Sequence, residues 1–168
     1  MISNLNFLFV TIFGLGKIKL IPGTFGSLAC IIVLYCLIYV FHISLHFIIA
    51  GLIIILLCSF FSIEMYIKKI HNKDPKEIVI DELIGQAIPI LAYEISHGTK
   101  KNADDSIIYY FICFILFRFF DILKPFPVSF FDERFKNSFG VIMDDVFAGL
   151  YVTLSLICLV ILKNYFNL

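Results

Sequence analysis

The 168-residue chain is 61% hydrophobic and 15% charged, with a mean hydropathy of +0.99. Soluble domains average about 45–50% apolar and about 25% charged residues, so the composition predicts a membrane protein and excludes a disordered chain. Thirteen basic and thirteen acidic side chains cancel, which excludes nucleic-acid binding through a basic surface. At roughly 100–200 residues per domain, the length predicts one domain over residues 1–168.

The N-terminal part of the chain shows no targeting signal. Neither a basic segment nor an Ala-x-Ala site accompanies the first apolar run, so we expect no signal peptide to be removed. Residues 22–27 read Pro-Gly-Thr-Phe-Gly-Ser and precede the first long apolar segment. Thr24 or Ser27 is expected to cap a helix there, and exposed N–H groups at a helix start can bind an anion. From this segment alone, an ordinary turn and cap is the favoured interpretation.

Residues 20–63 contain no Asp, Glu, Lys or Arg. The portion 28–63 would form a helix of about 54 Å, whereas a bilayer core is about 30 Å thick. Its only polar break is the pentapeptide His-Ile-Ser-Leu-His at residues 42–46. We therefore predict two spanning helices joined by a tight turn, with His42 and His46 at the turn instead of in a ligand site.

Three further apolar runs follow. Residues 83–93 and 107–117 hold 11 residues each, which reach only about 16 Å as helices. Each run is predicted to be a buried, re-entrant or interfacial helix, or a short crossing if flanking residues extend it. Residues 146–162 reach the lower limit for a spanning helix and are predicted to form a third span. The expected fold is all-α: a small polytopic membrane helical bundle with short interfacial or re-entrant helices.

The charged residues lie in blocks between the apolar runs. If everything except the hairpin turn and the C-terminus faces one side, that side carries 12 of the 13 Lys and Arg residues. The positive-inside bias makes it the cytoplasm. Placing residues 82 and 121 on the same side requires an even number of crossings between them, so zero and two both remain open.

All five cysteines lie inside apolar runs, with no Cys-x-x-Cys pair and no His at metal-ligand spacing. They are predicted to pack as small apolar side chains. A disulfide framework or a zinc site is therefore not expected.

Five carboxylates adjoin apolar segments instead of lying in open loops. They are Asp81, Glu82, Asp121, Asp144 and Asp145. Acids near helix N-termini can simply complement the helix dipole, at about 0.3–1 kcal/mol each, but acids brought together repel unless a cation binds. Oxygen ligands of this kind suit Mg²⁺, which also bridges to phosphate. The pattern favours a Mg²⁺ site over capping.

Basic residues beside these acids suit a phosphate group. Arg118 and Asp121 share a helix face, and Lys124 follows just before Pro125. Arginine can hold two phosphate oxygens at once, and lysine acts as a point charge. A plain ion pair between Arg118 and Asp121 is the structural alternative.

Glycines follow two of the carboxylates at four-residue spacing. Asp81 precedes Gly85, and Asp145 precedes Gly149. Glycine one turn from each carboxylate permits close approach of two membrane helices. We expect these helices to bring their acids within reach of one ion.

Four short sequence segments, taken together in chain order, form a pattern typical of one protein family. They are Gly-Leu-Gly with Pro-Gly-Thr-Phe-Gly-Ser-Leu (14–16 and 22–28), Asp-Glu-Leu-Ile-Gly-Gln (81–86), Phe-Arg-Phe-Phe-Asp-Ile-Leu-Lys-Pro-Phe-Pro (117–127) and Gly-Val-Ile-Met-Asp-Asp-Val-Phe-Ala-Gly (140–149). Together they resemble the phosphatidylglycerophosphatase A family over nearly the whole chain. The resemblance implies a mostly helical bacterial inner-membrane enzyme that needs Mg²⁺. Such an enzyme removes the terminal phosphate of phosphatidylglycerophosphate and yields phosphatidylglycerol, a cardiolipin precursor.

The resemblance carries over the five carboxylates as the acidic site and two cations as phosphate partners. Within that set we expect the metal ligands to be Asp81, Glu82, Asp144 and Asp145, with one or two Mg²⁺ bound. The expected catalytic residues are Asp121, as general base or nucleophile, with Arg118 and Lys124. The expected substrate contacts are Thr24, Gly26, Ser27, Arg118 and Lys124.

The chain departs from the family pattern at two places. Asn137-Ser138 stands where the family typically has Gly-Gly, and Asn tolerates a left-handed backbone better than most residues. The family's Asp-Arg appears here as Asp132-Glu133-Arg134, so Asp132 and Arg134 are left outside the expected site.

A small carboxylate-lined ion or proton transporter is the alternative from another class. It predicts acids deep within spans, whereas here they lie at segment edges with Arg and Lys between them. The expected partner is a membrane lipid and no nucleic acid. The crossing count, the oligomeric state and the choice between direct water attack and an aspartyl-phosphate stay open.

Overall fold

A computed structural model describes residues 2–70, 75–97 and 103–166. These parts contain seven α-helices and no β-strand, which confirms the expected all-α class. The elements are α1 (Ile2–Val10), the 3₁₀ turn η1 (Leu15–Lys17), α2 (Pro22–Tyr35), the π-helical η2 (Cys36–Val40), α3 (Leu45–Ile70), α4 (Ile80–His97), α5 (Ala103–Leu123), α6 (Val128–Arg134) and α7 (Ser138–Phe166). Four helices in these parts are long and apolar enough to cross a membrane: α2 continued by η2, α3, α5 and α7.

The first hairpin agrees with the sequence. α2 and η2 form a 19-residue segment, and α3 has 26 residues. The reversal lies at residues 41–44, where His42 has a φ of 50°. His42 and His46 are both exposed, so neither lies among the buried polar groups. All five cysteines are free; Cys30 and Cys113 are buried as predicted, whereas Cys36 is half-buried and Cys58 and Cys158 are exposed.

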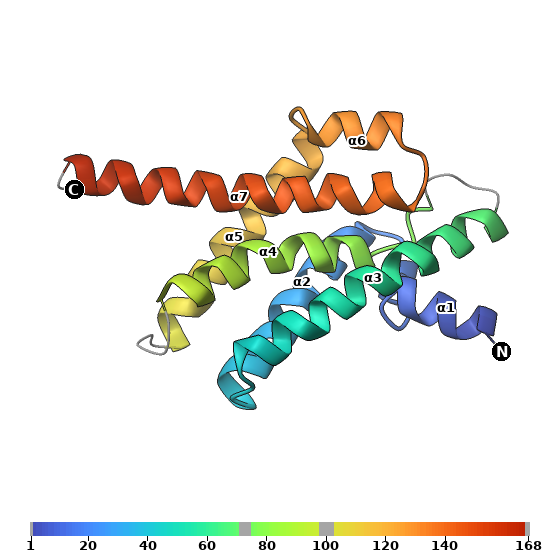
Figure 1. Cartoon of the computed structure of the whole chain (residues 1–168), viewed down its shortest axis with the longest axis horizontal. Coiled ribbons are helices and arrows are strands. Elements are labelled where there is room, and N and C mark those ends of the chain that lie inside the picture. The colour runs from blue at the N-terminus through green and yellow to red at the C-terminus, as the bar shows by residue number, and fades with distance from the viewer. Residues whose placement is uncertain (1, 71–74, 98–102, 167–168) are drawn as a thin grey trace.

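The two short apolar runs belong to longer helices because flanking residues extend them. α5 has 21 residues and could cross a membrane. The 18-residue α4 contains Pro89 and three buried polar side chains, Asp81, Gln86 and Glu94. It lies in the middle of the bundle, against α2, α5 and above all α7 (Figure 1). Flanking residues therefore extend both runs. α5 becomes long enough to cross a membrane, whereas α4 is the buried central helix.

α7 begins eight residues before the predicted span because polar contacts stabilise its start. Asn137 Oδ1 accepts a hydrogen bond from the Gly140 N–H at 3.1 Å, the geometry of an N-cap. The Glu64 carboxylate of α3 accepts a second bond from the Ser138 N–H at 3.2 Å. Asn137 is not among the residues with positive φ. Its side chain caps a helix here, instead of allowing the left-handed turn that the sequence suggested.

α4 and α7 touch through their glycines. A Cβ atom on Gly85 would lie 2.5 Å from the Asp145 carbonyl oxygen, and one on Gly149 would overlap the Gly85 carbonyl oxygen. The predicted close approach of the two helices is therefore confirmed. It brings the start of α4 against the start of α7, where the acids lie.

The far end of α4 is held by a hydroxyl network. Tyr39 and Tyr110 both donate to Glu94 Oε1, at 3.1 and 2.9 Å, and the Ser106 hydroxyl lies 2.6 Å from that of Tyr39. A buried carboxylate without partners would be costly. These hydroxyls stabilise Glu94 in the interior and tie η2, α4 and α5 together.

Candidate active site

The segment before the first span is already helical. α2 begins at Pro22, with Ile21 as a left-handed N-cap residue (φ 49°) and no capping side chain. Thr24 and Ser27 lie inside the first turns, where Ser27 Oγ donates to the Gly23 carbonyl at 3.0 Å. The prediction of a Thr24 or Ser27 cap is therefore wrong. Proline starts the helix instead, because it lacks an N–H and its φ is already helical.

Two glycines bring the start of α2 against the start of α4. A Cβ atom on Gly23 would overlap Glu82 Oε1 and lie 3.2 Å from Arg118 Nη1. A Cβ atom on Gly26 would lie 2.8 Å from the Val79 carbonyl oxygen. The missing side chain of Gly23 thus makes room for the Glu82 carboxylate.

Three carboxylates meet where α4 lies against α7. Asp81, Glu82 and Asp145 each offer one oxygen, and these oxygens lie within 4.8 Å of one another. Each residue also has a buried oxygen without a hydrogen-bond partner. Three negative charges this close repel, and a cation neutralises them. Carboxylate oxygens are the ligands that Mg²⁺ takes in proteins, so the chemistry of this donor set suits the ion.

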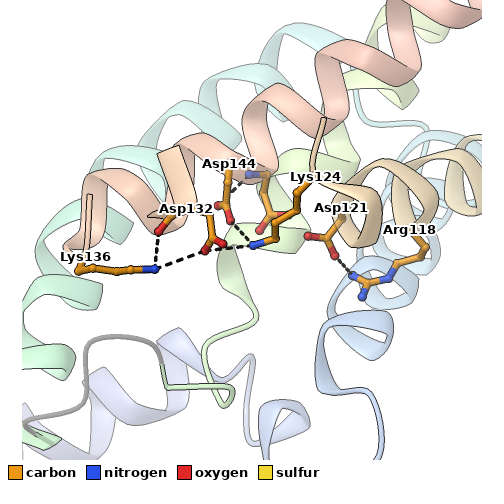
Figure 2. A network of polar contacts seen from close by, with 7 residues as sticks. Arg118, Asp121, Lys124, Asp132, Lys136 and Asp144 are labelled. Carbon is orange, nitrogen blue, oxygen red and sulfur yellow. Dashed lines mark hydrogen bonds and ion pairs between the residues drawn. The ribbon is translucent and has the colours of Figure 1, made fainter. Parts of the chain in front are cut away.

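Lys124 stands between two further acids. Its Nζ lies 3.1 Å from Asp144 Oδ2 and 3.1 Å from Asp132 Oδ1, and so joins α7 to α6 (Figure 2). Burial alone would lower the pKa of Lys124, but Asp144 and Asp132 outweigh this effect and raise the pKa above its usual value. The ammonium group is therefore charged at neutral pH.

Arg118 and Asp121 form the ion pair that the sequence offered as an alternative. Arg118 Nη1 lies 2.8 Å from Asp121 Oδ2, and the two side chains remain 18% and 17% exposed (Figure 2). Part of the guanidinium has no partner in the protein, since Arg118 Nε is buried without a hydrogen-bond partner. The contact with Asp121 orients the guanidinium.

All these side chains line one cavity of about 220 Å³. Its ten charged lining residues are Lys76, Asp81, Glu82, Arg118, Asp121, Lys124, Asp132, Lys136, Asp144 and Asp145. Carboxylates that can hold a cation thus stand beside cations that can hold an anion. This is the composition needed to bind a phosphate group next to a metal ion.

Comparison with known proteins identifies the family. The family model described as Phosphatidylglycerophosphatase A matches residues 8–160. The chain belongs to this family. As a member of the phosphatidylglycerophosphatase A family, it is a membrane protein and an enzyme, a phosphatase.

Three relatives illustrate the range of the match. Phosphatidylglycerophosphatase A of Haemophilus influenzae is 35% identical over 147 residues, 84% of this chain and 80% of that protein. A Bacteroides thetaiotaomicron protein named as a candidate phosphatidylinositol-3-phosphatase is 34% identical over 150 residues, 89% of each chain. Phosphatidylglycerophosphatase A of Escherichia coli is 30% identical over 139 residues, 82% of this chain and 73% of that protein. No solved structure gives a significant match.

Every charged residue that the sequence predicted for the active site lines the cavity of this phosphatidylglycerophosphatase A family member. Asp81, Glu82, Arg118, Asp121, Lys124, Asp144 and Asp145 all line it. The three uncharged residues expected to contact substrate, Thr24, Gly26 and Ser27, do not line it. Ile21, Pro22 and Gly23 contribute that wall instead. Gly26 and Ser27 are buried in contacts within and between helices.

Three charged lining residues were missed by sequence reasoning: Lys76, Asp132 and Lys136. Asp132 reaches the cavity because the chain reverses after Lys124 and α6 returns along α7 (Figure 1). The only sequence signal for Asp132 was its place after the Lys-Pro-Phe-Pro segment. Lys76 lies in the connection before α4, where no hydrophobic pattern marks a position.

Gly23→Ala is expected to lower phosphatase activity at least about tenfold, because its methyl group would overlap the Glu82 carboxylate. Phosphate release and Tm of the purified protein in detergent would be measured together. Leu28→Phe is the control, since it adds bulk at an exposed position of the same helix. Full activity of Gly23→Ala would mean that the position of the Glu82 carboxylate is unimportant.

Proposed function

We propose that the chain hydrolyses the terminal phosphate of phosphatidylglycerophosphate and yields phosphatidylglycerol and inorganic phosphate, in a reaction that depends on Mg²⁺. The observation that carries the proposal is the meeting of five carboxylates with Arg118 and Lys124 in one cavity of a membrane-spanning bundle. Membership of the phosphatidylglycerophosphatase A family supports it.

Arg118 and Lys124, which line the charged cavity, are proposed to bind the phosphate of the substrate. Arg118 is held by Asp121 and has a free Nε–H, which suits a second contact to a phosphate oxygen. Lys124 is charged and fixed between Asp132 and Asp144. Both positions are set before the lipid arrives, so little reorganisation is needed to stabilise the charge on the equatorial phosphate oxygens.

The residues proposed to hold Mg²⁺ are Asp81, Glu82 and Asp145, with Asp144 beside them. Their buried, unpartnered oxygens support this assignment. When bound, the ion supplies Lewis acidity at the phosphoryl oxygens and a lower pKa for a coordinated water. In formal charge, the six acidic and four basic lining residues leave an excess of two negative charges, which one divalent ion balances.

Asp121 is proposed as the general base or nucleophile. It lies on α5 and lines the cavity, and Arg118 orients one of its oxygens. In direct attack, Asp121 takes a proton from the attacking water while the bond between phosphorus and the ester oxygen breaks, and the ester oxygen takes a proton from solvent to become the hydroxyl of phosphatidylglycerol. In covalent attack, the Asp121 carboxylate displaces the same ester oxygen, and water then hydrolyses the aspartyl-phosphate to release phosphate and restore Asp121. Rapid acid quench with labelled substrate separates the routes: acid-stable, hydroxylamine-labile label on the protein would exclude direct attack.

The cavity is proposed to face the cytoplasm, in a bacterial inner membrane. Four basic residues, Lys76, Arg118, Lys124 and Lys136, line the cavity, and basic residues at one end of a membrane bundle favour the cytoplasmic side. A lipid can then keep its acyl chains in the bilayer while its head group enters the cavity.

Purified protein in detergent is expected to release phosphate from phosphatidylglycerophosphate with Mg²⁺ and not with EDTA. Asp121→Asn is expected to lower the rate by about 10²–10⁴-fold, the usual contribution of acid–base catalysis. Phosphatidylinositol 3-phosphate should be assayed in parallel, because one relative's name concerns that lipid. Equal rates for wild type and Asp121→Asn would eliminate the catalytic assignment. Preference for phosphatidylinositol 3-phosphate would eliminate the proposed substrate.

The transporter alternative finds no support along α4. Glu82, Gln86, Ile90 and Glu94 recur every four residues and share one helix face. Ile90 is fully buried and interrupts this polar line, and Glu94 is bonded to two tyrosine hydroxyls. The polar line along α4 is therefore interrupted, and Glu94 is separated from the acids of the cavity.

A further inference from the structure

A second cavity, here called the apolar groove, lies within the spanning part of the bundle. It measures about 340 Å³ and lies between α2–η2 and the first half of α3, with Leu83 of α4 also in its wall. Its eleven lining residues are all apolar. The catalytic chemistry proposed above makes no use of it.

The groove exists because the first hairpin packs loosely. Along their described lengths α2 and α3 have at most sparse close backbone contact, although they follow each other in the chain. Side chains of both helices line the space between them, among them Leu34 and Leu37 on the first helix and Phe47 on the second.

Gly51 lines the groove and puts no side chain into it. A Cβ atom on Gly51 would meet nothing within 4 Å, whereas one on Gly23, Gly85 or Gly149 would clash with a neighbouring element. Helix packing therefore does not require glycine at position 51. Glycine within a helix costs about 0.5–1 kcal/mol relative to alanine. An open groove is a physical reason for a missing side chain at this position.

The apolar groove and the charged cavity share two helices. On α4, Glu82 lines the cavity and the next residue, Leu83, lines the groove. On α2, Gly23 lines the cavity and Cys30 lines the groove, about 10 Å further along the helix. The groove then continues to Leu37, about 10 Å further. A lipid with its phosphate in the cavity would have its acyl chains at this depth.

We propose that the apolar groove binds one acyl chain of the lipid whose phosphorylated head group enters the charged cavity. This inference rests on the proposed function and adds a residue-level basis for recognising a long-chain lipid. An aliphatic chain suits the groove because no lining side chain offers a hydrogen bond or a charge. The helices around it are those that cross the bilayer, where lipid chains are the solvent.

Gly51→Leu fills the groove and tests the proposal. Two substrates are compared: phosphatidylglycerophosphate with long acyl chains and its dihexanoyl analogue, whose chains are too short to fill the groove. Gly51→Leu is expected to raise KM for the long-chain lipid about tenfold, the change expected when one or two fewer methylene groups are buried. KM for the dihexanoyl analogue and kcat for both substrates should stay within about twofold, which also shows that the variant is folded.

Ala50→Leu is the matched control. It adds a leucine at the neighbouring position of α3, which is exposed and does not line the groove. Its kinetics should match those of wild type with both substrates.

Two outcomes would overturn the inference. Unchanged KM of Gly51→Leu for the long-chain lipid would mean that the groove holds bulk lipid or nothing. An equal loss with both substrates would mean that position 51 acts through the fold. Wild-type protein that releases phosphate from neither substrate would instead reject the proposed function, and with it a substrate-binding role for the groove.

Discussion

Glu82→Gln and Asp145→Asn are each expected to lower Mg²⁺-dependent phosphate release by at least about 100-fold. Each substitution replaces a charged ligand by a neutral amide of the same shape, in a cluster whose oxygens lie within 4.8 Å of one another. A bound metal ion supplies several kcal/mol of transition-state stabilisation, and about 1.4 kcal/mol corresponds to a tenfold change in rate. The rate would be measured over a range of Mg²⁺ concentrations, and the concentration for half-maximal activity should rise.

Thermal unfolding gives a second test that does not depend on turnover. An ion that binds only the folded protein raises Tm by mass action, so Mg²⁺ should stabilise the wild type and not the variants. In EDTA the variants should be at least as stable as wild type, because one of three mutually repelling buried charges is gone.

Glu133→Gln is the control for both measurements, since Glu133 is exposed and does not line the cavity. It should behave as wild type. A Glu82→Gln or Asp145→Asn protein that keeps the Mg²⁺-dependent rise in Tm would show that the ion binds elsewhere.

Gly149→Ala is expected to destabilise the bundle by about 1–3 kcal/mol and to lower activity at least about tenfold. The added methyl group would overlap the Gly85 carbonyl oxygen, which belongs to helix backbone and cannot turn aside. α4 and α7 must then separate, one helical turn from Asp81 and Asp145. Tm and phosphate release of the purified protein would be compared with wild type.

Cys158→Leu is the matched control, because it adds bulk to α7 at an exposed position. It should retain both stability and activity. Normal Tm with normal activity in Gly149→Ala would show that the close contact of α4 and α7 is not needed to assemble the acids.

Several features were predictable because their physical cause is local in the chain. The uncharged stretch 20–63 is longer than one bilayer crossing, and its polar break marks the reversal that the structure has at residues 41–44. The four-residue spacing of Asp81 with Gly85, and of Asp145 with Gly149, places an acid and a small residue on one helix face. These predictions required only the bilayer thickness and the helical period.

Other features escaped prediction because they depend on neighbours distant in sequence. Thr24 and Ser27 resemble helix caps, yet Pro22 starts the helix and Gly23 forms the wall of the cavity. Asn137 suggested a left-handed turn and instead caps α7. In both cases several local conformations are close in energy, and contacts with α3 and α4 select one of them.

The amino-acid sequence alone determined the membrane class, the helical hairpin and the set of charged residues that stand at helix ends, since hydropathy and helical spacing act within each segment. Only the tertiary structure decided that Asp81, Glu82 and Asp145 form one cluster while Lys124 binds Asp132 and Asp144. It also decided that an apolar groove stays open beside them. The physical reason is that helix crossing points depend on how glycines and side chains of separate helices fit together, and no single segment carries that information.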